Sequence, residues 1–324
     1  MAYLPARTNL AQLRHQAEEL RRGDLASAQL AIAREYGFPS WAELELEVDR
    51  RDILNNRDLA RLTGLLAQHP ESATTKLAHW CDHKNGPDLL GYVAMLRFDH
   101  ERLGLPRELP GTGAIAKALL DAGAPVDGHA GDKETPLITA ASYGDAEVAE
   151  VLIEAGADID AVSAPDSGGV PSATALDHAA VFGMTQVLDL LVAAGARTGS
   201  LEMAAAAGDI SRWEPGRCTL QSRLRALVFA SDHQRLAVID QLVAAGTPVN
   251  QADAEWQRLP LHVAAHHGRP ASVRRLLAHG ADPGLRDPQH QRTPLDWCQP
   301  ENRYVDSPAH DEVDTILRPL TRSR

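Results

Sequence analysis

A short pattern of residues returns several times along this chain of 324 residues, and its spacing limits the possible folds more than any other feature. In each clear copy a leucine stands seven residues before a glycine, and a second glycine follows twelve residues later. The clear copies are ETPLITAASYGDAEVAEVLIEAGADIDA (134–161), ATALDHAAVFGMTQVLDLLVAAGA (173–196) and RLPLHVAAHHGRPASVRRLLAHGADP (258–283). A fixed period of this kind predicts a stack of small units, each of which buries its apolar face against its neighbours.

Weaker copies continue the pattern between and after the clear ones. They are RALVFASDHQRLAVIDQLVAAGTPVN (225–250) and SLEMAAAAGD (200–209), and RTPLDWCQPE (292–301) begins a further unit. In the first of these, Gln234 stands where the other copies have their first glycine. The repeat therefore tolerates variation in residue type while it keeps its spacing.

The chemistry of the repeated residues predicts two short helices in each unit. A threonine caps a helix with its hydroxyl, and a proline at the first helical position loses no hydrogen bond there, so a helix should begin at Thr135-Pro136. The first glycine should end that helix in a left-handed conformation. A second helix should follow, because apolar residues such as Val148 and Leu152 recur at helical spacing.

These residues resemble the ankyrin repeat, with its TPLH opening, its AAxxG centre and its LLxxGAD ending. The resemblance covers roughly residues 72–320, and the copies at 134–161 and 258–283 follow it most closely. It implies an all-α fold, an ankyrin-repeat solenoid of about six or seven helix-turn-helix units with a helical N-terminal cap. The stretch 88–128 looks like a degenerate copy, with DLLGYVAML as its first helix and IAKALLDAGAPVD leading out of its second.

The beginning of the chain does not show the repeat, and we expect residues 1–70 to form the helical cap. Ser40 and Glu43 make a capping-box pattern before a helix that starts at Trp41. The piece AQLAIAREYGFPSWAEL resembles the leader that precedes ankyrin repeats in many actinobacterial proteins, which implies a bacterial source. A repeat array needs such a cap to cover its outer apolar face. HDEVDTILRPL, at residues 310–320, should close the other end.

Residues 71–324 should form the repeat array itself. Three insertions interrupt its period, near 99–112, 163–172 and 211–222. We expect these insertions to be loops on one edge of the array, where they are able to wall off part of a groove.

The composition narrows the partners and the compartment. The formal net charge of −12 argues against nucleic acid and anionic membranes as partners and favours a protein with a basic or apolar surface. No apolar run is long enough to span a membrane, and the N-terminus lacks the apolar segment of a secretory signal. The three cysteines lie far apart and form no CxxC pair. We therefore expect a protein of the bacterial cytoplasm.

The resemblance also implies where a partner would bind. Partners of ankyrin proteins usually meet the turn fingers and the exposed residues of the first helices, which line a concave groove. Mapped onto this sequence, the binding residues are Tyr143, Phe182, His233, Trp256, His266 and His267. Aromatic residues make up only 4% of the chain, so their presence at these positions favours a binding face. Packing against the inserted loops is the alternative.

Several polar residues raise the question of catalysis, and the candidates are His178, Asp177 and His266. His262 and Asp177 stand where the resemblance implies a histidine that hydrogen-bonds between neighbouring turns, which favours a structural role for both. His178 falls where the repeat normally buries an apolar residue, which favours a buried neutral histidine over a functional one. No GxSxG, HExxH, CxxC or phosphate-binding glycine loop is present.

The sequence therefore predicts a non-enzymatic scaffold, without a cofactor, that recognises a protein through its concave groove. The alternative is an enzyme or a small-molecule binder that uses a pocket in the groove, closed by the inserted loops. An open groove with exposed aromatic residues would favour the scaffold. A deep pocket with converging polar side chains would favour the alternative.

One short stretch, HWCDHK at residues 79–84, gathers the side chains that bind metals. Aligning TKLAHWC with TPLDWCQ predicts that it lies on the first helix of a degenerate repeat. On such a helix His79, Asp82 and His83 share one face, a ligand set that suits a non-haem iron or a similar ion, whereas Cys81 points away. The structural interpretation is favoured over a metal site, because metal-ligand geometry is demanding.

Protein purified without a metal-affinity tag should therefore contain no stoichiometric transition metal, and elemental analysis measures this directly. A stoichiometric metal that disappears after His79→Ala and His83→Ala would contradict the structural interpretation. It would also make the enzyme the better hypothesis.

Overall fold

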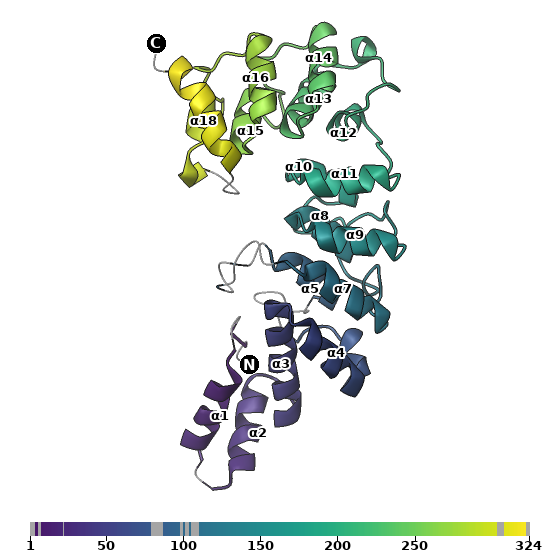
Figure 1. The fold of residues 1–324 in the computed structure, drawn as a ribbon, viewed down its shortest axis with the longest axis vertical. Coiled ribbons are helices and arrows are strands. Elements are labelled where there is room, and N and C mark those ends of the chain that lie inside the picture. Colours follow the sequence, from purple (N-terminus) through teal and green to yellow (C-terminus); the bar gives the residue numbers. More distant parts are fainter. Residues whose placement is uncertain are drawn as a thin grey trace. The chain divides into compact units, whose positions relative to one another are not determined.

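The computed structural model describes residues 4–5, 8–21, 23–78, 87–97, 100, 104, 110–302 and 308–321. Within these residues the secondary structure is helical, with no strand and with one isolated bridge between Val162 and Thr174. The chain divides into two compact units, Met1–Ala175 and Leu176–Arg324. Figure 1 shows the succession of helices along the chain.

The first unit begins with the helices of the N-terminal segment. They are α1 (Leu10–Glu19), α2 (Leu25–Glu35), α3 (Trp41–Asn56), α4 (Leu59–Gln68) and the short 3-10 helix η1 (Pro70–Ala73). Each of the four α-helices follows a residue whose side chain accepts backbone N–H groups of the first turn, namely Asn9, Asp24, Ser40 and Asp58. Helices α1, α2 and α3 pack together around a small core that includes Leu13, Ile32 and Leu44.

Two helix pairs of the repeat complete the first unit. The degenerate copy forms α5 (Leu89–Met95) and α7 (Thr112–Asp121), and the copy at 134–161 forms α8 (Pro136–Tyr143) and α9 (Ala146–Glu154). Helix α5 packs against α8 and α7 packs against α9, so equivalent helices of successive repeats lie side by side (Figure 1). Thr135 caps α8 as predicted, because its hydroxyl accepts the Ile138 N–H at 3.2 Å.

The second unit holds the remaining repeats. Its helices are α10 (Ala175–Val181), α11 (Thr185–Ala193), α12 (Leu201–Ala207), η2 (Pro215–Arg217), α13 (Leu220–Asp232), α14 (Leu236–Ala244), α15 (Pro260–His266), α16 (Pro270–Ala278), α17 (Pro294–Trp297), η3 (Pro300–Asn302) and α18 (Pro308–Thr321). The first helices α13, α15 and α17 pack in series. Helices α14, α16 and α18 form a second series beside α13 and α15 (Figure 1). Helix α18 buries Val313 and Leu317 against this core, which confirms a helix at the predicted closing segment.

The turns after the first helices α8, α10, α13 and α15 each use a residue in the left-handed region, as the spacing predicted. Gly144, Gly183 and Gly268 have φ values of 75°, 72° and 63°. Gln234, which replaces glycine in a weak copy, has a φ of 55°. A side chain at this φ costs conformational strain that the surrounding packing must offset. The weak copy therefore keeps the backbone geometry of the repeat without its glycine.

The structure corrects two expected boundaries. Residues 220–222, expected in the third inserted loop, form the first turn of α13, because the Thr219 hydroxyl accepts the Ser222 N–H at 3.1 Å. Residues 75–78, expected to begin a helix, are not helical. Leu77 is buried there, and its N–H donates to a backbone carbonyl at 3.2 Å.

Of the other two insertions, the structure describes one in full and only a small part of the other. Residues 163–172 form an irregular loop, and the Ser163 hydroxyl donates to the Val170 carbonyl within it at 2.7 Å. Most of 99–112 lies outside the described residues, as does all of 79–84 with the metal candidates His79, Asp82 and His83.

A buried ionic network ties α3 to the segment that follows η1. Glu47 is 3% exposed and accepts hydrogen bonds from Arg50 at 2.5 Å and from Arg51 at 2.9 Å. Arg50 also donates to three backbone carbonyls between residues 72 and 76, and Arg51 donates to the carbonyl of Ala78. These bonds satisfy carbonyls of η1 and of the irregular segment that follows it.

A second contact joins α3 to the first repeat directly. The buried Tyr92 on α5 donates its hydroxyl to Oδ1 of Asn55 on α3 at 2.5 Å. On these two contacts we propose that residues 1–70 act as the N-terminal cap of the array in residues 71–324.

Glu47→Gln should lower the free energy of unfolding by about 3 kcal/mol or more, because it removes a carboxylate that balances two buried guanidinium groups. Urea unfolding followed by circular dichroism measures the change. Glu45→Gln is the matched control on the same helix. Its exposed pair with Arg14, at 2.9 Å, should contribute less than about 1 kcal/mol. Equal losses in the two variants would mean that the network does not hold α3 in place.

Candidate functional site

One cavity of about 310 Å³ lies within the second unit. Its walls come from the end of α10, from α15 with the turn before it, and from α17 with the turn before it. The lining residues are Val181, Phe182, Gln257, Arg258, Leu259, His262, Val263, His266, His267, Asp287, Gln289, His290 and Trp297. This cavity, named here the Trp297 pocket, therefore combines first-helix residues with turn residues, the two kinds of position that the repeat resemblance associates with a groove.

Local structure fixes the position of Trp297 at the end of the very short helix α17. Thr293 and Asp296 form a reciprocal capping box, in which the Thr293 N–H donates to Asp296 at 2.8 Å and the Asp296 N–H donates to the Thr293 hydroxyl at 3.3 Å. The indole N–H of Trp297 then donates to Oδ2 of Asp287 at 3.1 Å. The capping box therefore fixes the backbone of this helix, and the bond to Asp287 fixes the orientation of the indole ring.

Asp287 organises the turn beneath the indole. Its carboxylate accepts the backbone N–H groups of Gln289, His290 and Arg292 at 3.0, 2.6 and 2.9 Å. Burial acts to raise the pKa of Asp287, but these hydrogen bonds outweigh it and lower the pKa to about 2. The carboxylate is consequently charged at neutral pH.

Three histidines pack around the Trp297 indole. The ring centroids of His262, His266 and His290 lie 6.1, 5.3 and 5.7 Å from that of Trp297, and all three contacts are close to edge-on. Such edge-to-face contacts are favourable for aromatic rings. His262 also donates from Nε2 to the Arg292 carbonyl at 3.0 Å, which is the bond between neighbouring turns that the resemblance implied.

Burial keeps two of these histidines uncharged. It lowers the pKa of His262. Burial, together with the charge of the adjacent His267, lowers the pKa of His266 to about 4. The pocket wall thus contains two imidazoles that are neutral at pH 7.

His267 is held by a buried carboxylate. Its Nδ1–H donates to Oδ1 of Asp232 at 2.6 Å, and Nε of Arg269 lies 3.7 Å from the same oxygen. Burial acts to raise the pKa of Asp232, yet the charge and hydrogen bond of His267 lower it well below its usual range. The residues that line the pocket include no serine, threonine or cysteine, so this Asp–His pair lacks a nucleophile of the chain's own beside it.

His233, expected at the binding face, is instead an interior residue with 1% exposure. Its Nε2 donates to the Ala180 carbonyl at 3.1 Å, and Nδ1 pairs with the Thr185 hydroxyl at 2.9 Å. The exposed position expected for His233 is therefore wrong, because both ring nitrogens are used inside the unit. Burial lowers its pKa to about 4.

The catalytic candidates lie in different surroundings. His178 is fully buried, and its ring centroid is 6.1 Å from that of Phe182. Asp177 is half-buried, and neither it nor His178 lines the Trp297 pocket, whereas His266 does. The burial of His178 fits the interior histidine that its repeat position favoured.

The other residues predicted to bind a partner do not all lie in one place. Phe182, His266 and His267 line the Trp297 pocket. Trp256 does not, and it packs edge-on against Phe229 at 5.6 Å. Tyr143 is the last residue of α8 in the first unit and is half-buried.

Sequence reasoning missed Trp297, the residue at the centre of the pocket. A signal was present, because RTPLDWCQ aligns with RLPLHVAA and places Trp297 at the position of Val263. Both residues line the pocket, one repeat apart. The alignment marks this position, and the fold decides that it lines the pocket.

In the part of the chain that the structure describes, no group of three or more histidine, cysteine, aspartate or glutamate side chains is arranged to hold a metal ion. The set formed by His79, Asp82 and His83 lies outside that part and stays a prediction.

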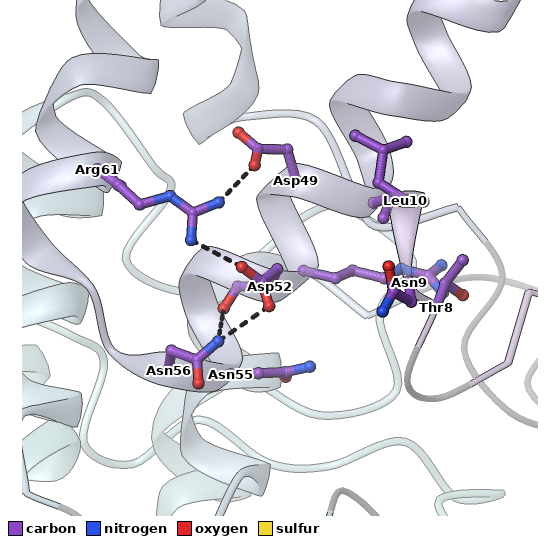
Figure 2. Close-up of a pocket in the computed structure, with 10 residues that line it drawn as sticks. Thr8, Asn9, Leu10, Asp49, Asp52, Asn55, Asn56 and Arg61 are labelled. Atoms are coloured by element: carbon purple, nitrogen blue, oxygen red, sulfur yellow. Dashed lines mark hydrogen bonds and ion pairs between the residues drawn. The ribbon is translucent and has the colours of Figure 1, made fainter. Parts of the chain in front are cut away.

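The first unit contains a separate polar cavity of about 490 Å³ that the sequence did not predict. Figure 2 shows its wall, where Arg61 donates to Asp52 at 2.7 Å and to Asp49 at 2.5 Å, and Asn56 donates to Asp52 at 3.0 Å. Asn9, at the start of α1, lines the opposite side of the cavity. Because the carboxylates and the guanidinium pair with one another, this wall offers mainly amide groups to a ligand.

The buried histidines make the stability of the second unit depend on pH. An unfolded histidine has a pKa of about 6.5, whereas the pKa values of His233 and His266 are lowered to about 4 in the folded chain. The folded state therefore binds fewer protons than the unfolded state between these values. The stability that these groups provide is complete above about pH 6.5 and is lost as the pH falls towards 4.

His233→Gln should reduce this loss, because a glutamine amide is able to donate to the Ala180 carbonyl but does not titrate. Urea unfolding at pH 7 and pH 5 measures the difference in free energy for each protein. The wild type should lose up to about 2 kcal/mol per buried histidine between these two values, and the variant should lose less. An identical pH dependence in both proteins would contradict the assignment.

Comparison with known proteins adds the family evidence. The family model described as ankyrin repeats (3 copies) matches residues 110–201, and the model described as ankyrin repeats (many copies) matches residues 242–298. Among solved structures, the ankyrin repeat domain of human ASB11 aligns with 20% identity and a TM-score of 0.39, covering 81% of this chain and 94% of that one. No curated protein matches the sequence.

None of the helices that the structure describes has the length and hydrophobicity needed to cross a bilayer. The described residues form helices and the turns between them with no strand, and both family models fall on the helix pairs set out above. This chain contains ankyrin repeats, and its fold is an all-α ankyrin-repeat solenoid.

Proposed function

We propose that this chain binds a protein partner and that the partner contacts the second unit at the Trp297 pocket. Ankyrin repeats generally mediate protein–protein interaction, and this is the coarse function that the family supports. The observation that carries the finer proposal is the convergence of Phe182, His266, His267 and Trp297 on one cavity. Aromatic residues in a pocket are the usual anchors of protein interfaces.

The size of the pocket supports a protein partner over a large ligand. At about 310 Å³, it lies at the lower end of the roughly 300 to 1,000 Å³ that small-molecule sites occupy. A cavity of this size suits one long side chain from a larger partner. The absence of a nucleophile among its lining residues gives no support to the enzyme alternative.

The charge of the chain is unevenly divided between the units. Residues 1–175 contain 16 basic and 27 acidic residues, whereas residues 176–324 contain 16 basic and 17 acidic residues. The net charge of −12 therefore resides almost wholly in the first unit. Long-range attraction of a basic partner would act mainly on the first unit, and shorter-range contacts would act at the pocket. On its composition, we place this function in the bacterial cytoplasm.

The test is capture of partners from the native host with immobilised full-length protein, followed by quantitative mass spectrometry. The double variant Phe182→Ala and His290→Ala should lose the partner at least about ten-fold, because each anchor contributes roughly 1 to 2 kcal/mol. Both positions are partly exposed, so the melting temperature should change little.

Leu220→Ala is the control for this experiment. Leu220 is 36% exposed in the same unit and does not line the pocket, so its variant should capture the partner as the wild type does. A protein captured equally by the wild type and the double variant would place the interface elsewhere and contradict the proposal.

A further inference from the structure

We propose that the Trp297 pocket receives the side chain of an arginine from the protein partner. This inference rests on the proposed function and narrows it, because it names the group that enters the pocket. It follows from the aromatic wall, from the carboxylate beside that wall, and from how the chain binds one of its own arginines.

The Trp297 indole is a suitable surface for a cation. Tryptophan is the side chain whose face attracts cations most strongly, within about 6 Å of the ring centre. Its N–H donates to the charged Asp287 carboxylate at 3.1 Å. A hydrogen bond to an anion makes the indole richer in electrons, and the carboxylate itself adds a negative charge at the ring edge. Both effects favour a positively charged occupant.

Two histidines of the same wall add no competing charge. Burial lowers the pKa of His262, and it lowers the pKa of His266 to about 4, so both imidazoles are neutral at pH 7 and neither repels a cation. A guanidinium is planar, so it is able to stack flat on the indole between such neutral groups.

The second unit already contains one guanidinium bound in this manner. The Cζ atom of Arg225 lies 5.6 Å from the ring centroid of Trp256. Its guanidinium also donates to Glu202 at 3.2 Å and to Glu255 at 2.8 Å. Trp297 likewise has a carboxylate beside its indole, that of Asp287. The partner would supply the cation that Arg225 supplies to Trp256.

One feature of the pocket opposes a cation. Arg258 lines the rim and is exposed, so its charge should repel an incoming arginine and attract an acidic group instead. This opposition provides a decisive experiment. Reversing the charge at position 258 should raise the affinity of the pocket for an arginine and lower its affinity for an acidic group. The residue is exposed, so the substitution should not disturb folding.

The probes are three small compounds with capped backbones: Nα-acetyl-arginine methylamide, its citrulline analogue and its glutamate analogue. Citrulline has nearly the shape of arginine without the charge. Full-length ¹⁵N-labelled protein is titrated with each compound, and the indole N–H resonance of Trp297 is followed. That resonance is identified by its loss from the spectrum of the Trp297→Phe variant.

The arginine compound should shift the Trp297 resonance in a saturable way, and the citrulline compound should bind at least about ten-fold more weakly, which corresponds to 1.4 kcal/mol for the charge. Arg258→Glu should tighten arginine binding several-fold. Trp297→Phe should weaken it, measured through the side-chain resonances of the pocket histidines. If that variant does not fold, the Arg258→Glu result decides alone.

Three results would overturn the inference. Equal binding of arginine and citrulline would show that charge is not recognised. A preference for glutamate, weakened by Arg258→Glu, would identify an acidic partner group. No shift of Trp297 with any probe would show that the pocket takes no such side chain. In each case the capture experiment with the Phe182 and His290 double variant still decides the proposed function separately.

Discussion

The alanine pair at the centre of helices α8, α10, α12 and α15 is the contact on which much of the fold depends. These alanines are 0 to 1% exposed throughout: Ala140, Ala141, Ala179, Ala180, Ala204, Ala205, Ala264 and Ala265. A methyl group lets the short helices of successive repeats approach closely, and a larger side chain would overpack the contact. Because this contact recurs with the same spacing, the residues that follow each alanine pair occupy equivalent positions in the repeats that have one.

Buried polar bonds then close the ends of the first helices. In the second unit, His233 donates to the Ala180 carbonyl, Arg269 to the Gly183 carbonyl, Arg235 to the Ala206 carbonyl, and His310 to the His266 carbonyl. Carbonyls at a helix C-terminus have no partner within the helix, so donors from later repeats satisfy them. The histidines and arginines of this part of the chain thus include residues that bind the repeats together, and only some of them face a ligand.

The turns before α15 and before α17 each depend on an aspartate. Asp253 accepts the N–H groups of Glu255 and Trp256, and Asp287 accepts those of the turn that leads to α17. The second aspartate additionally holds the Trp297 indole. One structural device therefore serves both the fold and the candidate site, since the carboxylate that shapes the turn also orients the aromatic wall of the pocket.

The sequence by itself determined the repeat, the two-helix unit and the left-handed turns, because these follow from spacing and from the properties of threonine, proline and glycine. It also indicated Phe182, His266 and His267 as groove residues. Only the tertiary structure decided that His233 is interior and that Trp297 is central. The physical reason is that a repeat position specifies a direction from its own helix, whereas burial depends on which donors and acceptors the neighbouring repeats bring to that place.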